Sequence, residues 1–353
     1  MTTIDNQPQH TATVDGASGV LRIDLAPGLS AALADGLRPI AYPRRGAEDA
    51  YVSGLRRLAY QVLSPELLAV FDGLRSGAST PTAVLFTGLP YDNVLSAPKA
   101  GEQNRDRKPS DVSENLCVLL AALIGDPYGA QGEGLRLVNE VIPTEEDRLR
   151  FTGAGSEVPL DYHTEHAGFR RLLGDRDLSP QGLMLIGVCA PDEGAPKTWV
   201  SNGRLAMRLL SDAQLAELQG EAARLAIPVR QRRAERDPFL PPSPLLAGPA
   251  GAETITGAFY GDMLEPTSAD AAEAVAAFKA ALKQIGFGLV IRPGSAVYVP
   301  NGYTLHARDP FTPTFDHEGR AKRWLQRVFV TGRLDLFGAA TSAAQRVFEL
   351  PKP

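Results

Sequence analysis

The pair His163 and Glu165, answered by His306 about 140 residues later, constrains the fold of this chain more than any other sequence feature. Residues i and i+2 of a β-strand point to the same face, so His163 and Glu165 can face one point while Thr164 turns away. A distant strand carrying His306 would complete two imidazoles and one carboxylate on one face of a metal ion, which is the arrangement of non-heme Fe(II) sites with open coordination positions. A His-x-Glu tripeptide alone is weak evidence, and the residues that follow His306 strengthen it.

Two arginines follow His306 on a predicted strand. Arg323, Leu325 and Arg327 alternate onto one strand face. Two guanidinium groups on one face are costly unless each meets an anion, and guanidinium pairs with carboxylates in a bidentate manner. The pattern therefore predicts two bound carboxylates near the metal. The alternative is that either arginine pairs with a structural acid of the protein.

Composition bounds the classes of protein that remain. The chain has 353 residues, of which 44% are hydrophobic, which is ample for a buried core. A net charge of −5 and a pI of about 5.7 argue against a nucleic-acid partner. The sequence contains no run of 18 apolar residues, so no membrane span is predicted. The polar start of the chain lacks the apolar region of a signal peptide. Cys117 and Cys189 lie in apolar runs and are expected to be buried free thiols of a cytoplasmic protein.

The order of predicted elements favours a mainly β fold with flanking helices. Helices are expected over residues 48–60, from Ser64 onward, and over 111–124, 202–218 and 268–284. Short strands are expected over residues 83–86, 135–142, 158–165, 183–190, 197–201, 227–233, 254–260, 288–292, 295–300 and 324–331. Many short strands with helices are typical of a β-sandwich or barrel buttressed by helices. We expect a flexible N-terminus over 1–18 and a single domain over 19–353, because no linker separates the two halves of the metal set.

Four segments together resemble the clavaminate synthase-like branch of the Fe(II)/2-oxoglutarate-dependent oxygenases. They are residues 160–165, Lys197-Thr198, residues 301–311 and residues 323–327, all within 130–332. That branch includes arginine and asparagine 3-hydroxylases and, more distantly, taurine dioxygenase. The resemblance implies a double-stranded β-helix core, also called a jelly-roll and similar to cupins. This chain departs from the family at Ala307, where relatives have glycine, and in an insertion of about three residues within 312–321.

The resemblance also implies roles for individual residues. His163, Glu165 and His306 match the iron ligands, and the co-substrates would be 2-oxoglutarate and O2, with ascorbate helping in vitro. Arg323 and Thr198 match the residues that hold the distal carboxylate of 2-oxoglutarate. Arg327 matches the arginine that holds the substrate carboxylate, although the roles of the two arginines could be exchanged.

Signals for the substrate are softer. Asp262 matches the second of two acids that relatives use for arginine, and Tyr260 replaces the first, which suggests a basic or polar amino acid other than arginine. Asp262 could equally be a turn residue. Ser156 and Gln131 match residues near the substrate amino acid in relatives, and Glu165 could also accept a bond from the substrate amine. Residues 168–180 and 232–251 have the length and composition of lids, and His166 is expected to face away from the metal.

The predicted activity is hydroxylation of an unactivated C–H bond of a free amino acid or amino-acid derivative, in specialised metabolism such as antibiotic biosynthesis. Halogenases of this fold have a small residue at the position of Glu165, so a carboxylate there favours hydroxylation. The same machinery could instead catalyse desaturation or cyclisation. A zinc hydrolase uses similar ligands but gives no reason for the arginine pair. A non-catalytic, cupin-like binding protein is the alternative outside enzymes. We expect a small-molecule substrate, and the oligomeric state stays open.

Overall fold

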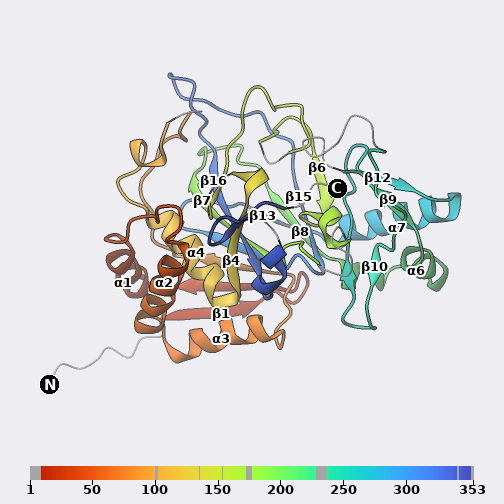
Figure 1. The fold of residues 1–353 in the computed structure, drawn as a ribbon, viewed down its shortest axis with the longest axis horizontal. Helices are drawn as coiled ribbons and strands as arrows, with labels where there is room; N and C mark the ends of the chain where they lie inside the picture. The colour runs from red at the N-terminus through yellow and green to blue at the C-terminus, as the bar shows by residue number, and fades with distance from the viewer. Residues whose placement is uncertain are drawn as a thin grey trace.

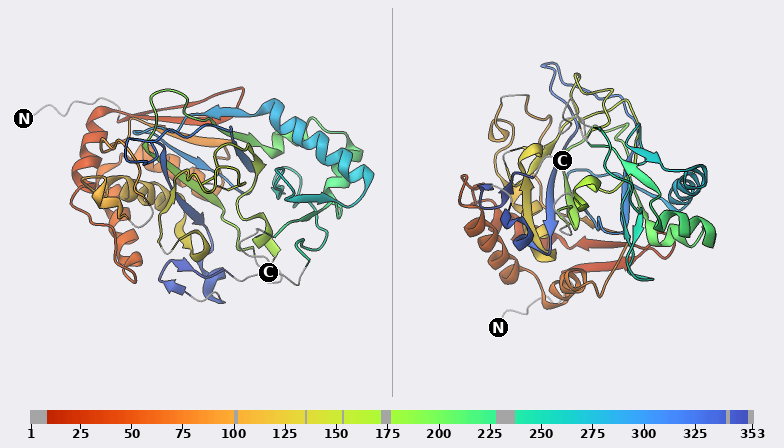
Figure 2. Two further views of the ribbon diagram at one scale, coloured as in Figure 1. Left: turned by 90° about the horizontal axis from the view of Figure 1, so that it is seen from above. Right: turned by 45° about the vertical axis from the view of Figure 1, so that its right-hand side comes forward.

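The computed structural model describes residues 9–99, 102–134, 136–152, 154–171, 177–227, 237–339 and 342–350. Two β-sheets form the centre of the molecule, with helices α1 to α3 at one end and α6 and α7 at the other (Figure 1 and Figure 2). None of the helices in this part of the chain combines the length and the apolar character that crossing a membrane requires. Cys117 and Cys189 are buried free thiols, as predicted.

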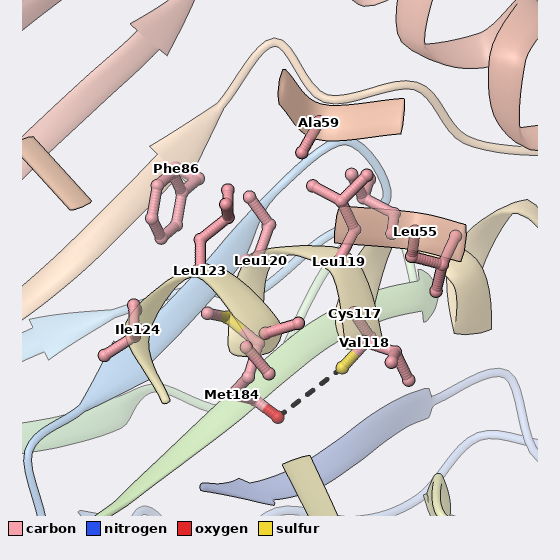
Figure 3. Packing of buried hydrophobic residues seen from close by; sticks show 14 of the residues in the cluster. Leu55, Ala59, Phe86, Cys117, Val118, Leu119, Leu120, Leu123, Ile124 and Met184 are labelled. Atoms are coloured by element: carbon pink, nitrogen blue, oxygen red, sulfur yellow. Dashed lines mark hydrogen bonds between the residues drawn. The ribbon is translucent and has the colours of Figure 1, made fainter. Parts of the chain in front are cut away.

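The N-terminal third supplies one edge of the larger sheet and the helices that cover it. Its elements are β1 (His10–Val14), β2 (Val20–Leu25), α1 (Pro27–Leu37), α2 (Glu48–Val62), α3 (Pro65–Ser76), β3 (Ala83–Thr87) and α4 (Val112–Ile124). The Ser64 side chain caps α3 by accepting a hydrogen bond from the Leu67 N–H, and Pro65 occupies the first turn. Every residue of α4 is buried, because the helix lies between α2 and the larger sheet. Figure 3 shows its Leu119, Leu120 and Leu123 among apolar side chains of this core.

The larger sheet carries ten strands among the described residues. The remaining strands are β4 (Asp126–Ala130), β5 (Asn139–Val141), β7 (Gly182–Cys189), β14 (Ala296–Val299), β16 (Trp324–Thr331), β17 (Ser342–Ala344) and β18 (Val347–Phe348). Their order is β1-β2-β3-β14-β7-β16-β4-β18-β17, and β5 also pairs with β16. The pairs β2/β3 and β4/β18 are parallel, and the other pairs are antiparallel.

The smaller sheet has the order β13-β8-β15-β6, with all pairs antiparallel. Its strands are β6 (Leu160–His163), β8 (Thr198–Asn202), β13 (Phe287–Leu289) and β15 (Thr304–Arg308). One apolar cluster joins Val200 and Leu289 of this sheet to Leu185, Val297 and Leu325 of the larger sheet. The two sheets therefore pack face to face, and the chain crosses from one to the other between β14 and β15.

Helices and short strands cover the outer side of the smaller sheet. They are α5 (Gly203–Met207), α6 (Asp212–Gln219), β9 (Ala223–Leu225), β10 (Leu246–Ala247), β11 (Thr254–Ile255), β12 (Leu264–Pro266) and α7 (Ala269–Ile285). Ser268 caps α7 through the Ala271 N–H. The helix predicted over 202–218 is two helices, because Ser211 forms a capping box with Gln214 and starts α6 anew.

Several predicted boundaries are wrong. The expectation of a flexible segment over 1–18 fails for His10–Val14, which pairs with β2 along its whole length. The strand predicted over 158–165 ends at His163. The strand predicted over 227–233 lies mostly outside the described residues. Strand β4 was not predicted, because Pro127 and Gly129 interrupt it, and the strand carrying His306, β15, was expected without bounds.

Candidate active site

The three predicted metal ligands come together. His163 at the end of β6 lies directly opposite His306 of β15, and their ring centroids are 4.1 Å apart. Glu165 follows β6 by two residues, and its Oε2 is 3.9 Å from His306 Nε2. One ligand atom from each residue lies within 4.8 Å of the others. Two imidazoles and one carboxylate at this separation form a donor set that fits a divalent iron ion.

Hydrogen bonds with the backbone fix this arrangement. Asn301 is fully buried, and its Oδ1 accepts a hydrogen bond from the Glu165 N–H at 2.7 Å while its Nδ2 donates to the Glu165 carbonyl at 3.0 Å. Between the two candidate ligands, Thr164 exchanges backbone and side-chain bonds with Gly257. His163 Nδ1 lies 3.0 Å from the Asp161 carbonyl, which leaves Nε2 for the centre. The role of Asn301 was not predicted. The only sequence signal for it was its place in the segment 301–311.

Electrostatics favour the ligand forms of all three side chains. Burial lowers the pKa of His163 and lowers that of His306 well below its ordinary value, so both imidazoles are neutral near pH 7. Burial alone would raise the pKa of Glu165, but the Arg327 guanidinium and the neighbouring histidines lower that pKa to about 2. Neutral imidazoles and an ionised carboxylate are the forms that bind a metal ion.

The site opens into a cavity of about 890 Å³ that reaches between the two sheets. Arg323, directly before β16, and Thr198 of β8 are buried and line it. Within the described part of the chain Arg323 has no ion-pair partner, and its Nη1 lacks a hydrogen bond. Burial lowers its pKa to about 9, so the group remains charged near neutral pH. A buried, uncompensated guanidinium on a cavity wall fits an anionic ligand.

Arg308 is a functional candidate that the prediction did not assign. Its guanidinium is buried, lines the same cavity and donates to the carbonyls of Gly155 and Val158, the latter at 2.9 Å. Burial lowers its pKa to about 10. The Phe311 ring lies 5.3 Å from the Arg308 guanidinium and 5.2 Å from that of Arg323. Two charged guanidinium groups therefore lie at the same end of the cavity. The sequence signal for Arg308 was its position two residues after His306.

Arg327 lies between two carboxylates of the protein. Its Nη1 is 2.9 Å from Glu165 Oε2 and its Nη2 is 2.9 Å from Glu133 Oε2. The alternative pairing with protein acids thus occurs in this structure for Arg327. Glu133 was missed, because the prediction chose Gln131 in the same 3-10 turn, Gln131–Glu133. Glu133 lines the cavity, and Gln131 is not among its described lining residues.

The expected orientation of His166 is wrong. Because β6 ends at His163 and His166 adopts a positive φ of 53°, its ring turns toward the cavity instead of away from it. His166 Nε2 is 3.4 Å from Glu133 Oε1 and 3.9 Å from Glu165 Oε1. Burial lowers its pKa to about 4, and the ring packs against Phe169 and Phe329.

The remaining predicted substrate residues divide into two groups. Tyr260 and Asp262 line the cavity, with Tyr260 edge-on to His163 at 5.2 Å between ring centroids and Asp262 exposed at the mouth. Ser156 is fully buried and is not among the described lining residues, and its carbonyl accepts a hydrogen bond from the Phe311 N–H at 2.8 Å. Its Oγ has no hydrogen-bond partner among the residues that the structure describes.

The two predicted lids are described only in part. Residues 172–176 of the first and 232–236 of the second lie outside the described residues. Gly168 and Phe169 of the first and Leu240 of the second line the cavity. Arg170 of the first donates to the Ile255 carbonyl and to Thr256 Oγ1, each at 2.5 Å. Lid movement stays a prediction.

Comparisons with known proteins agree with this geometry. No family model matches the chain. L-asparagine oxygenase of Streptomyces coelicolor is 26% identical over 80% of this chain and 81% of its own length. Clavaminate synthase 2 of Streptomyces clavuligerus is 27% identical over 75% and 78%. The predicted resemblance to the clavaminate synthase-like oxygenases is confirmed. Enduracididine beta-hydroxylase of Streptomyces hygroscopicus is 26% identical over 69% of this chain and 75% of its own length.

Solved structures share the fold. Asparagine oxygenase in complex with Fe(II), 3-hydroxyasparagine and succinate has a TM-score of 0.78 at 24% identity, covering 94% of this chain and 99% of that structure. The non-heme iron oxygenase OrfP in complex with Fe and alpha-ketoglutaric acid has a TM-score of 0.77 at 23% identity, covering 94% and 100%. This chain therefore shares with these two oxygenases a mainly β architecture with flanking helices.

Proposed function

We propose that this protein is an Fe(II)/2-oxoglutarate-dependent oxygenase that hydroxylates an unactivated C–H bond of an amino acid or amino-acid derivative. The observation that carries the proposal is the combination of His163, Glu165 and His306 with Arg323, which meets no acid of the described residues, in one cavity. A zinc hydrolase would need the first three residues only. The named activities of the relatives, which include an asparagine oxygenase and an enduracididine hydroxylase, support it.

The two facing sheets would form a double-stranded β-helix. The smaller sheet carries His163 and His306, and the larger sheet carries Arg327. This placement fits a reaction centre between the sheets. A cytoplasmic location and a place in specialised metabolism stay predictions.

The residues of the chain would divide the work as follows. His163, Glu165 and His306 hold Fe(II), which together with 2-oxoglutarate and O2 supplies the oxidising power for C–H hydroxylation. Arg323 and Thr198 hold the distal carboxylate of 2-oxoglutarate. The guanidinium of Arg327 keeps Glu165 ionised, and the apolar walls of the cavity exclude water from the reacting atoms.

Arg323 has no ion-pair partner in the described part of the chain, which favours it over Arg327 as the partner of 2-oxoglutarate. Arg327 would then bind the α-carboxylate of the substrate, for which it must release or share Glu133. Glu133 and Glu165 both offer carboxylate oxygens near this point, so they could accept hydrogen bonds from the substrate amine. The roles of Gln131, Ser156, Tyr260 and Asp262 stay predictions.

The test is succinate release from 2-oxoglutarate under air with Fe(II) and ascorbate, across proteinogenic and related amino acids. His163→Ala should abolish the stimulated release, and His317→Ala is the matched control because its side chain is 89% exposed. The product mass then separates hydroxylation, which adds one oxygen atom, from desaturation or cyclisation, which removes two hydrogens. Stimulated release that survives His163→Ala would contradict the proposal.

A further inference from the structure

The cavity extends past the metal ligands to a wall that neither of the two main sheets provides. Leu225 of β9, Leu240 and Met263, which directly precedes β12, line this wall. A backbone bond from the Leu240 N–H to the Leu225 carbonyl and another from the Ala226 N–H to the Met263 carbonyl hold the three segments together. Leu225 and Leu240 belong to the apolar core under α5 to α7, so the wall is anchored in packed structure.

A second apolar surface leads outward from the metal centre. The Tyr260 ring lies edge-on to His163, and the Phe151 ring stacks on Tyr260 with centroids 5.8 Å apart. Phe151 also covers Gly261, where an added Cβ would come within 3.0 Å of the ring. Phe151 and Leu149 keep 40% and 60% of their surface exposed although both line the cavity. Large apolar side chains left open at a cavity mouth mark a ligand-binding surface.

Charged groups on these two surfaces are few among the described lining residues. Asp147 and Arg150 pair with each other at 3.0 Å, and Asp262 is exposed at the mouth. The other charged lining residues are Glu165 and Glu133 with Arg327, then Arg308 and Arg323 in the inner part, and Glu140 of β5. The inner part thus suits an amino-acid head group and 2-oxoglutarate, and the outer part suits an uncharged side chain.

We infer that the substrate is an α-amino acid whose side chain is apolar and about as large as that of leucine or methionine. This inference rests on the proposed function and replaces the expectation of a basic or polar substrate, which depended on Asp262. A buried amide or ammonium group would lose its hydrogen bonds to water and find no partner on Leu225 and Leu240. An apolar side chain gains from the same burial. A cavity of about 890 Å³ has room for 2-oxoglutarate together with such an amino acid.

Pairs of amino acids with the same shape and different polarity test this inference. Leucine is compared with asparagine, methionine with glutamine, and norleucine with lysine. Two quantities are measured for each pair with the full-length protein: stimulated succinate release with Fe(II), and the dissociation constant from anaerobic calorimetry with Mn(II) and 2-oxoglutarate. The apolar member of at least one pair should bind and stimulate about 10-fold or more better than its polar partner.

Two variants connect the preference to the wall. Leu240→Ala should weaken binding of the preferred apolar amino acid about 10-fold and leave the dissociation constant of 2-oxoglutarate unchanged. Leu95→Ala is the matched control, because Leu95 is 77% exposed and does not line the cavity. Preference for asparagine, glutamine or lysine, or no response to any of the six compounds, overturns the inference while the proposed function stands. Absence of Fe(II) and 2-oxoglutarate binding would instead overturn the proposed function.

Discussion

At the scale of single residues, Asn301 shows how the backbone of a candidate ligand is fixed. Its amide bonds both the N–H and the carbonyl of Glu165 and also donates to the Pro180 carbonyl at 2.8 Å. Glu165 lies beyond the end of β6, so no strand pairing holds it. Asn301 therefore fixes the backbone of Glu165, as strand pairing fixes the backbone of His163.

Asn301→Ala should weaken Fe(II) or Mn(II) binding by about 10- to 100-fold, the usual effect of losing a group that orients a metal ligand. Asn301→Asp keeps the acceptor for the Glu165 N–H and should lose less. Calorimetric titration with the metal ion measures the affinity of both variants, and circular dichroism checks that each variant keeps the fold. Equal metal affinity in all three proteins would show that Glu165 needs no such support.

Arg308 should contribute to 2-oxoglutarate affinity through its charge. Neither Arg308 nor Arg323 has a carboxylate partner among the described residues, so both should attract the distal carboxylate of 2-oxoglutarate. Arg308→Gln should weaken 2-oxoglutarate binding about 10-fold or more, because one unit charge within about 12 Å contributes about 1.4 kcal/mol or more at an effective dielectric constant of about 20. Arg308→Lys should restore most of the affinity, and the exposed Arg208→Gln is the control.

The readout for Arg308 is the dissociation constant of 2-oxoglutarate with Mn(II), compared with that of 2-oxopentanoate, which lacks the distal carboxylate. A purely structural role for Arg308, through Gly155 and Val158, would weaken both ligands equally and would not be rescued by lysine. If Arg308 acts through its charge, the variant should weaken the binding of 2-oxoglutarate more than the binding of 2-oxopentanoate.

At the scale of elements, a buried ion pair ties the N-terminal end of α4 to the long segment before it. Lys108 and Glu114 are both fully buried as side chains and pair directly, with Ser113 and Asn104 completing the hydrogen bonds. Burial alone would raise the pKa of Glu114, but the Lys108 ammonium group lowers it overall. Its contribution to stability is therefore present above the ordinary carboxyl pKa and is lost as pH falls through the lowered value.

Glu114→Gln should lower the free energy of unfolding by about 3–5 kcal/mol at pH 7, because it leaves the Lys108 charge buried without a partner. Urea unfolding measures the loss, with the exposed Glu273→Gln on α7 as control. The wild-type protein should also lose more stability than the variant as the pH is lowered. A cost below about 1 kcal/mol, as for a surface pair, would mean that water reaches Lys108.

Local patterns predicted the elements whose signals are local, and failed where distant contacts decide. The N-cap Ser64, the helical spacing of apolar residues over 268–284 and the alternation in 323–327 gave α3, α7 and β16 correctly. The metal set was predictable because ligand chemistry restricts residue types. The role of Glu133 was not predictable, because it depends on the distant Arg327. The turn at His166 was not predictable either, because it depends on where β6 ends. Two-residue periodicity does not report where a strand stops.

At the scale of the whole molecule, the candidate site joins the two sheets. The smaller sheet provides His163, His306 and Thr198, and the segment that enters β16 of the larger sheet provides Arg323. A 2-oxoglutarate molecule between the metal and Arg323 would connect both sheets. Unfolding separates the sheets, so ligand binding and global stability should be coupled.

Thermal unfolding with Mn(II) should therefore respond to 2-oxoglutarate. At 100 times its dissociation constant, 2-oxoglutarate should raise the free energy of unfolding by about 2.7 kcal/mol, and the midpoint should continue to rise with concentration. Arg323→Met should abolish this increment but keep the shift caused by Mn(II), whereas His163→Ala should reduce both. Without ligands, Arg323→Met should be at least as stable as the wild type, because an uncompensated buried charge is removed. A destabilised, ligand-free Arg323→Met protein would instead show that Arg323 supports the fold, and the bridge between the sheets would then have to be sought at Arg308.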